Sequence, residues 1–233
     1  MKKYALFLGV LLVVGACSSE DGNQKMVVEG TIQGLKKGTL YLQHITDSTL
    51  VNVDSLEIRG DGKFRLQTQV AQPDLYYLYL DKADNNILDD RIPFFGEPGN
   101  YQINTSWDAF ETDAKIQGTE SQEKYEVFRE NMSKFNLQRL ELARMMASPE
   151  ISGDSLRIDS LQGELDNNIR RSYLYSINFA INNKDSYLAP FIAFTEVSDA
   201  NPKYLDSVYR ALPPHIAASK YGKKLKELLG NTP

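Results

Sequence analysis

The spacing of apolar residues changes once along the chain, at about Gly118. From Met26 to Gly118, apolar and polar residues alternate and turn-forming residues recur at short intervals, which is typical of β-strands. Beyond Gly118, apolar residues recur at helical spacing, as on one face of an α-helix. This change predicts an α+β protein, with an antiparallel β-sandwich over residues 26–118 and an α-helical domain, packed against it, over residues 119–230.

The first part of the chain contains seven or eight short predicted strands, a pattern typical of an antiparallel sandwich or an open barrel, of which we expect the sandwich. They cover Val27–Ile32, Thr39–Ile45, Leu50–Ile58, Lys63–Val70, Leu75–Leu80, Asn86–Gly96, Tyr101–Asn104 and Ala114–Ile116. The turn Gly60-Asp61-Gly62 predicts a hairpin, because glycine accepts positive φ. Both faces of Leu75–Leu80 are apolar, so we expect the helices to cover one sheet at this strand, with Tyr77 and Phe94 in the core.

The second part of the chain predicts five helices. A first helix of roughly 25 residues follows Gly118 and ends near Ser148. Asp154 is the expected N-cap of a second long helix, and the short connection predicts that the two are antiparallel. Three shorter helices follow, over Ser186–Val197, from Pro202, and from Pro213-Pro214 to Gly230.

The chain begins like an export signal. A pair of lysines precedes an apolar run over Tyr4–Val14, which is too short to span a membrane, and the small pair Gly15-Ala16 leads directly into Cys17. This ending resembles the lipobox of bacterial lipoproteins, in which the cysteine thiol is acylated and becomes the first residue of the mature protein. We therefore expect removal of residues 1–16 and lipid on Cys17; the alternative is an ordinary cleaved signal with a chance cysteine.

Residues 17–25 are polar and predict a flexible tether between the lipid and the folded part. Glu20 and Asp21 follow Cys17 closely, and in some Gram-negative lineages such an acidic patch resembles a signal for display on the outer face. A plain solvated linker is the alternative. The expected location is the cell envelope, on an outer-membrane anchor, with the periplasmic and the surface-exposed face both open.

Charge and cysteine content narrow the function classes. The formal net charge is -5, and loss of Lys2 and Lys3 would take it to -5 - 2 = -7. An acidic chain without a basic stripe argues against nucleic acid and against electrostatic docking on anionic lipid, so membrane attachment is expected through the acyl chains on Cys17. Because Cys17 is the one cysteine, disulfides and thiol chemistry are not expected once it is acylated.

Few side chains suggest chemistry of their own. His44 and His215 have no neighbouring histidine or cysteine at ligand spacing, so we expect neither a metal site nor a cofactor. An acidic string could hold calcium, although a solvated loop explains it better: Asp81, Asp84, Asn85, Asn86, Asp89 and Asp90. Asp89, Asp90 and Glu97 could supply the pair of carboxylates that glycoside hydrolysis uses. Trp107, in a polar stretch, is the best candidate for an exposed binding contact.

Several short strings resemble, in their order, the family called domain of unknown function 4369. They are Val28-Glu29-Gly30-Thr31-Ile32, Gly38-Thr39-Leu40-Tyr41-Leu42, Val53-Asp54-Ser55, Asp61-Gly62-Lys63-Phe64 and Glu97-Pro98-Gly99. The resemblance implies an exported or lipidated protein in which this domain precedes a helical region and, often, a thioredoxin-like domain of thiol-disulfide oxidoreductase type. The strings Ser186-Tyr187-Leu188-Ala189-Pro190-Phe191 and Tyr221-Gly222-Lys223-Lys224-Leu225 look like that helical region.

The chain departs from that family pattern after its helical part. It stops at Pro233, about where the thioredoxin-like domain would begin, and it has no Cys-x-x-Cys. No catalytic residue of the family can therefore be placed on it. We expect a non-catalytic binding or accessory module of the envelope that recognises a protein or a glycan. The alternatives are an accessory partner of a separate thioredoxin-like protein, a carboxylate-dependent envelope enzyme, and a purely structural lipoprotein.

Overall fold

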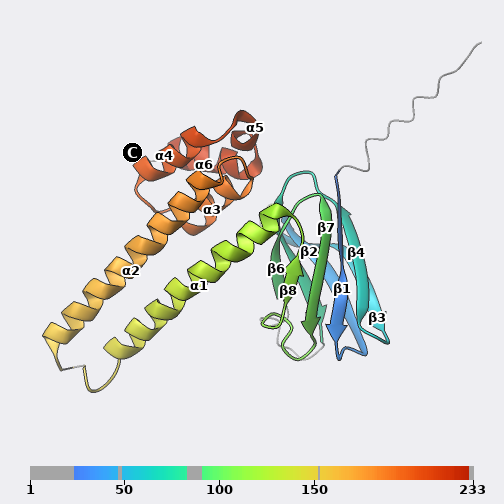
Figure 1. Cartoon of the computed structure of the whole chain (residues 1–233), viewed down its shortest axis with the longest axis horizontal. Coiled ribbons are helices and arrows are strands. Elements are labelled where there is room, and N and C mark those ends of the chain that lie inside the picture. The colour runs from blue at the N-terminus through green and yellow to red at the C-terminus, as the bar shows by residue number, and fades with distance from the viewer. Residues whose placement is uncertain (1–23, 47–48, 83–90, 152, 231–233) are drawn as a thin grey trace, which may run out of the picture.

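A computed structural model of the chain describes residues 24–46, 49–82, 91–151 and 153–230. A β-sandwich comes first and a helical region follows, so the predicted α+β class and the order of its two parts are confirmed (Figure 1). The expected signal, the tether as far as Asn23, and Cys17 itself lie outside the described residues.

Eight strands form two four-stranded sheets in the described part of the chain. They are β1 (Lys25–Gln33), β2 (Lys37–Thr46), β3 (Thr49–Arg59), β4 (Lys63–Gln69), β5 (Asp74–Asp81), β6 (Arg91–Gly96), β7 (Gly99–Ser106) and β8 (Lys115–Gln117). The sheet orders are β4-β1-β7-β8 and β3-β2-β5-β6. All pairs are antiparallel, as predicted, except β1 with β7, which run parallel at the centre of the first sheet.

The turn at Gly60-Asp61-Gly62 does not close a hairpin. Its two glycines have φ of 119° and 75°, as the sequence suggested, but β3 and β4 belong to different sheets, so the turn carries the chain across the sandwich. The crossing is tight, because the backbone N–H of Ile32 donates to the carbonyl oxygen of Gly62 at 2.9 Å. A Cβ on Gly62 would come within 2.1 Å of the Ile32 carbonyl oxygen, which requires glycine there.

Strand β5 alternates between two environments. Its even positions, Tyr76, Leu78 and Leu80, are buried between the sheets, and Phe94 of β6 is buried with them, as predicted. Tyr77 was predicted to lie in the core as well, but it lies half-buried on the outer face. The helices cover only the start of this face, at Leu75, rather than the whole sheet.

Six helices make up the described C-terminal part. They are α1 (Glu120–Met146), α2 (Ser155–Asn182), α3 (Leu188–Glu196), α4 (Pro202–Ala211), α5 (Pro214–Ala217) and α6 (Lys220–Gly230). Asp154 caps α2 as predicted, because its carboxylate accepts from the Arg157 N–H at 3.1 Å. The single helix expected from Pro213-Pro214 to Gly230 is instead two, and Ser219 between them accepts from the Gly222 N–H at 3.2 Å.

Helices α1 and α2 form a long antiparallel pair that extends away from the sandwich (Figure 1). At the far end, Leu142, Ile151 and Leu161 form a small apolar cluster of their own. At the near end, the pair packs with α3 and β6, and α3 to α6 gather beside the start of α1. None of the helices that the structure describes is both long and apolar enough to cross a membrane.

Candidate binding groove between sandwich and helices

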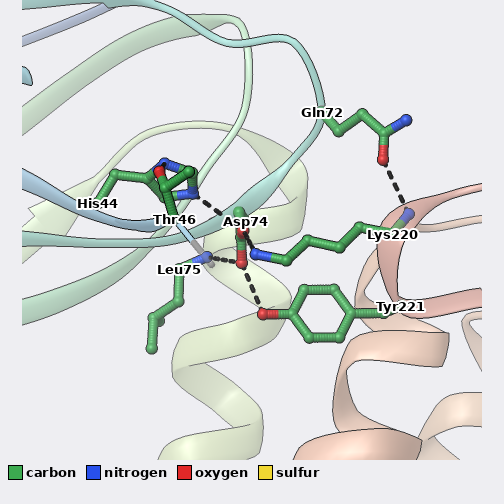
Figure 2. A network of polar contacts seen from close by, with 7 residues as sticks. All are labelled: His44, Thr46, Gln72, Asp74, Leu75, Lys220 and Tyr221. Carbon is green, nitrogen blue, oxygen red and sulfur yellow. Dashed lines mark hydrogen bonds and ion pairs between the residues drawn. The ribbon is translucent and has the colours of Figure 1, made fainter. Parts of the chain in front are cut away.

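Asp74, the first residue of β5, connects the sandwich to α6 (Figure 2). One carboxylate oxygen accepts from the Tyr221 hydroxyl at 2.7 Å and from the Leu75 N–H at 2.8 Å. The other accepts from His44 Nε2 at 2.9 Å and from the Lys220 ammonium group. The side chain is almost entirely buried, so these bonds replace the water that an exposed carboxylate would bind.

The network of His44, Asp74, Lys220 and Tyr221, here called the Asp74 network, fixes the charge of the carboxylate. Burial by itself would raise the pKa of Asp74, but the hydrogen bonds from His44, Lys220 and Tyr221 outweigh burial and lower the pKa to about 2. Burial and the neighbouring carboxylate raise the pKa of the Tyr221 hydroxyl. Asp74 therefore stays ionised with its oxygens occupied, which suits it to holding α6 in place rather than to accepting a proton.

A second polar contact fixes the start of α6. The first N–H groups of a helix have no partner inside the helix. Here the Lys220 N–H donates to the side-chain oxygen of Gln72 at 2.8 Å, and Gln72 belongs to the segment that leads into β5. His44 is held from the other side, since its ring stacks on Tyr76 with 4.5 Å between the ring centroids.

An aromatic cluster joins the helices to β6. Phe95 of β6 lies against Tyr125 of α1 and Phe191 of α3, with ring centroids 6.1 and 5.3 Å away. Phe191 in turn meets Tyr221 edge-on at 5.0 Å. The fully buried Gln122 side chain adds a polar tie, because its oxygen accepts from the Phe95 N–H at 2.7 Å. Sandwich and helices are thus held together by apolar contact and by specific hydrogen bonds.

Between these two contacts lies a groove of about 980 Å³, here called the β5 groove. Residues from the ends of β2 and β4, from the start of β5 and from α1, α3 and α6 line it, among them Ile45, Thr46, Gln69, Tyr77, Tyr125, Phe191, Thr195, Glu196, Tyr221 and Lys224. A volume of this size is typical of ligand sites, which are mostly apolar with a few polar groups that orient the ligand.

Two hydroxyl groups in the β5 groove are free to bind a ligand. Within the described residues, neither the Tyr77 nor the Tyr125 hydroxyl makes a hydrogen bond. Burial raises the pKa of both, that of Tyr125 to about 12, so both stay protonated and can donate. Burial also raises the pKa of Glu196 at the edge of the groove. Lys224 lies over the rings of Phe194 and Tyr221, at 5.3 and 5.6 Å.

The residues singled out from sequence lie apart from this groove or contribute to it indirectly. Trp107 follows β7, is 49% exposed, and packs against Gly34 at the opposite end of the sandwich. His215 is exposed on α5, and its ring contacts Tyr187 at 6.4 Å between centroids. His44 lies on β2 and belongs to the Asp74 network, a contact that its neighbours in the sequence did not indicate. Cys17 remains a prediction.

The proposed acidic sites fall largely outside the described residues, where Asp84, Asn85, Asn86, Asp89 and Asp90 all lie. Asp81 ends β5, and Glu97 accepts from the Ser121 hydroxyl at 3.0 Å. In the part of the chain that the structure describes, no three histidine, cysteine or acidic side chains gather where they could hold a metal ion.

Comparison with known sequences supports a family for the first part of the chain. Residues 26–125 match the family model described as Domain of unknown function (DUF4369). The match covers all eight described strands and continues into α1 as far as Tyr125, so it includes the Gln122 and Tyr125 contacts with Phe95. No curated protein matches the chain. The sandwich and the first turns of α1 are therefore a DUF4369 domain, the family that the order of its short strings indicated.

Proposed function

We propose that the protein is a membrane-anchored lipoprotein of the cell envelope that binds a protein or glycan partner in the β5 groove. The observation that carries the proposal is the unoccupied bonding capacity of the Tyr77 and Tyr125 hydroxyls in a groove lined by aromatic rings. Sugar rings and protein side chains stack on aromatic faces and form hydrogen bonds with free donors beside them.

Binding fits the groove better than catalysis. Both oxygens of Asp74 already accept two hydrogen bonds each, so the carboxylate has little capacity left to accept a proton from a ligand. Burial raises the pKa of two other carboxyl groups, Glu126 and Glu196. Glu126 borders the hollow at Pro93 and Glu196 borders the β5 groove, and neither carboxyl group is among the causes of the other's pKa shift.

The location follows from the start of the chain. The lysine pair, the short apolar run and Gly15-Ala16-Cys17 support export, cleavage and acylation of Cys17. Two or more acyl chains on Cys17 would hold the protein at the membrane without a spanning helix. The outer membrane is the proposed site.

Capture from intact cells tests the proposal. Thr195→Arg places a long charged side chain at an exposed position on the wall of the groove, and Thr112→Arg does the same at an exposed position far from it. In both places the hydroxyl bonds only to a backbone carbonyl, so the pair is matched. We expect one partner to be recovered with the native chain and with Thr112→Arg, and to be lost with Thr195→Arg. Recovery that is equal for all three, or no specific partner, would refute binding in the groove.

The same experiment separates the alternative role. The DUF4369 match is the reason to consider an accessory of a separate thioredoxin-like protein. If the partner that is lost with Thr195→Arg contains a Cys-x-x-Cys pair, the accessory role is the correct form of the proposal.

A further inference from the structure

Helix α6 carries a charge opposite to that of the rest of the chain. Its lysines, Lys220, Lys223, Lys224 and Lys226, are opposed on the same helix only by Glu227, while the chain as a whole has a net charge of -5. The buried side of the helix is formed by Gly222 and Leu225. With 3.6 residues per turn, all four lysines fall on the half of the helix opposite Leu225, and Lys223, Lys224 and Lys226 are exposed.

The start of this basic helix lies close to the N-terminal end of the described chain. The Lys220 N–H is bound to Gln72, and two residues before Gln72 the Val70 N–H donates to the carbonyl oxygen of Gln24 at 2.8 Å. Gln24 is the first described residue, and it lies seven positions after Cys17. Even fully extended, seven residues reach about 24 Å. An anchor at Cys17 therefore keeps α6 near the membrane surface.

We propose that α6 is a membrane-contacting surface that binds the anionic lipid headgroups of the leaflet that holds Cys17. The inference rests on the anchor in the proposed function, but not on the β5 groove. Lys223 and Lys226 are exposed and can meet lipid phosphates, and so is Lys224, although its ammonium group also lies over the rings of Phe194 and Tyr221. Lys220, by contrast, is bound to Asp74.

The negative net charge does not prevent this contact. At physiological ionic strength, exposed charges more than about 8 Å apart are largely screened. Acidic residues farther than this from α6, on the sandwich and on the α1/α2 pair, therefore act weakly there. The charges close to the exposed face of α6 decide the interaction, and on the helix itself lysines outnumber the single glutamate, Glu227. From the sequence we expected no electrostatic attraction to anionic lipid, because the chain is acidic and no basic stripe stood out. In the structure, the exposed lysines of α6 lie together on a helix that begins beside the segment bonded to Gln24.

Contact through α6 also orients the molecule. Trp107 lies at the other end of β1, since its N–H donates to the Gln33 carbonyl oxygen at 3.0 Å, and the nine residues of β1 separate it from the anchored end by about 26 Å. The β5 groove, which shares Lys220 and Lys224 with α6, would face the membrane side, and the Trp107 end would face away.

Vesicle binding tests the contact directly. The mature chain with Cys17→Ser, which carries no lipid, is mixed at low salt with vesicles that contain phosphatidylglycerol or with pure phosphatidylcholine vesicles. We expect binding to the first only, and loss of it at high salt. The triple variant Lys223→Gln, Lys224→Gln, Lys226→Gln keeps the Asp74 network and should bind about 100-fold more weakly, since each lysine near an anionic surface contributes about fivefold.

A matched control removes the same number of charges elsewhere. Lys134→Gln, Arg144→Gln and Arg157→Gln together change exposed cations on α1 and α2 and should leave vesicle binding unchanged. The proposal is wrong if the Cys17→Ser chain with its lysines intact binds neither vesicle or binds both equally, or if the control variant binds as weakly as the α6 variant. Thr195→Arg leaves all these lysines unchanged and is read out by capture rather than by vesicle binding, so failure of the groove and failure of the membrane contact are seen separately.

Discussion

The sandwich and the α1/α2 pair bury very different side chains. Between the sheets the core is apolar and large, and its fully buried members include Met26, Ile32, Leu40, Leu42, Leu66, Leu78, Leu80, Phe94 and Tyr101. Midway along α2, by contrast, Asn168, Ser172 and Ser176 are buried against α1. The Asn168 amide nitrogen donates to the Gln138 side-chain oxygen at 2.7 Å, while its Oδ1 has no partner in the described residues.

The sandwich and the α1/α2 pair therefore differ in what holds each of them together. The sandwich derives its stability from close packing of apolar groups, where loss of a large side chain leaves a cavity. The helix pair accepts a buried polar segment that contributes little stability, and a buried asparagine is known in coiled coils to fix the register of two helices at a cost in stability. The Asp74 network lies between these extremes, since it is polar but almost fully hydrogen-bonded.

The largest effect should come from the sandwich core. Phe94→Ala removes a fully buried ring that contacts Tyr76 and Tyr101, and it should lower the free energy of unfolding by about 3–5 kcal/mol. Leu140→Ala, on an α1 side chain that is 68% exposed, is the control and should change it by less than about 0.5 kcal/mol. Urea denaturation followed by circular dichroism measures both. Similar losses for the two variants would contradict the comparison.

Asp74→Asn should lower the free energy of unfolding by a smaller amount, and this change should depend on pH. The fall in the Asp74 pKa from 3.8 to about 2 on folding corresponds to about 2 kcal/mol in favour of the folded state. Because the folded pKa is the lower one, this contribution is complete above about pH 4 and is lost as the pH falls toward 2.

Urea titrations of the native chain and of Asp74→Asn at several pH values check this sign. The native chain should be more stable by about 2 kcal/mol at neutral pH, and the difference should shrink toward zero near pH 2. A difference that stays constant or grows in acid would mean that the ionised carboxylate does not stabilise the contact with α6.

The smallest effect should have the opposite sign. Asn168→Leu removes the unpartnered Oδ1 from the α1/α2 contact and should raise the free energy of unfolding by about 1 kcal/mol, since Gln138 is exposed and can bond to water instead. Denaturation curves measure the change, with Gln138→Ala as the control for loss of the hydrogen bond alone. A loss of stability larger than about 1 kcal/mol would show that the asparagine stabilises the pair rather than only setting its register.

Local patterns predicted most of the elements. The alternation of apolar and polar residues predicted strands β1 to β4. Residue type predicted the cap at Asp154 and the start of α4 at Pro202. Phe94 was correctly assigned to the core. Sheet membership was harder, because a turn with two glycines fits a hairpin and a crossing between sheets equally well. The parallel pairing of β1 with β7 likewise depends on the path of the chain between these two strands, which the alternation of apolar and polar residues does not predict.

The groove could not be predicted for a similar reason. Asp74 and Lys220 are 146 positions apart, and neither is unusual among its neighbours in sequence. Tyr77 looked like a core residue because both faces of its strand are apolar, and only the position of the helices shows that its face is open. The basic face of α6 was missed as well, because apolar residues interrupt its four lysines in the sequence and the lysines share one face only once the helix is formed.

The proposed function and the proposed membrane contact both depend on a lipid anchor at Cys17, because in both proposals that anchor brings the β5 groove and α6 to a membrane. The most direct test is the intact mass of the protein extracted from the membrane fraction of the cells that make it. We predict a chain that begins at Cys17 and carries the mass of two or more acyl chains. A chain that begins at Met1, or one with an unmodified Cys17, would contradict the proposed function.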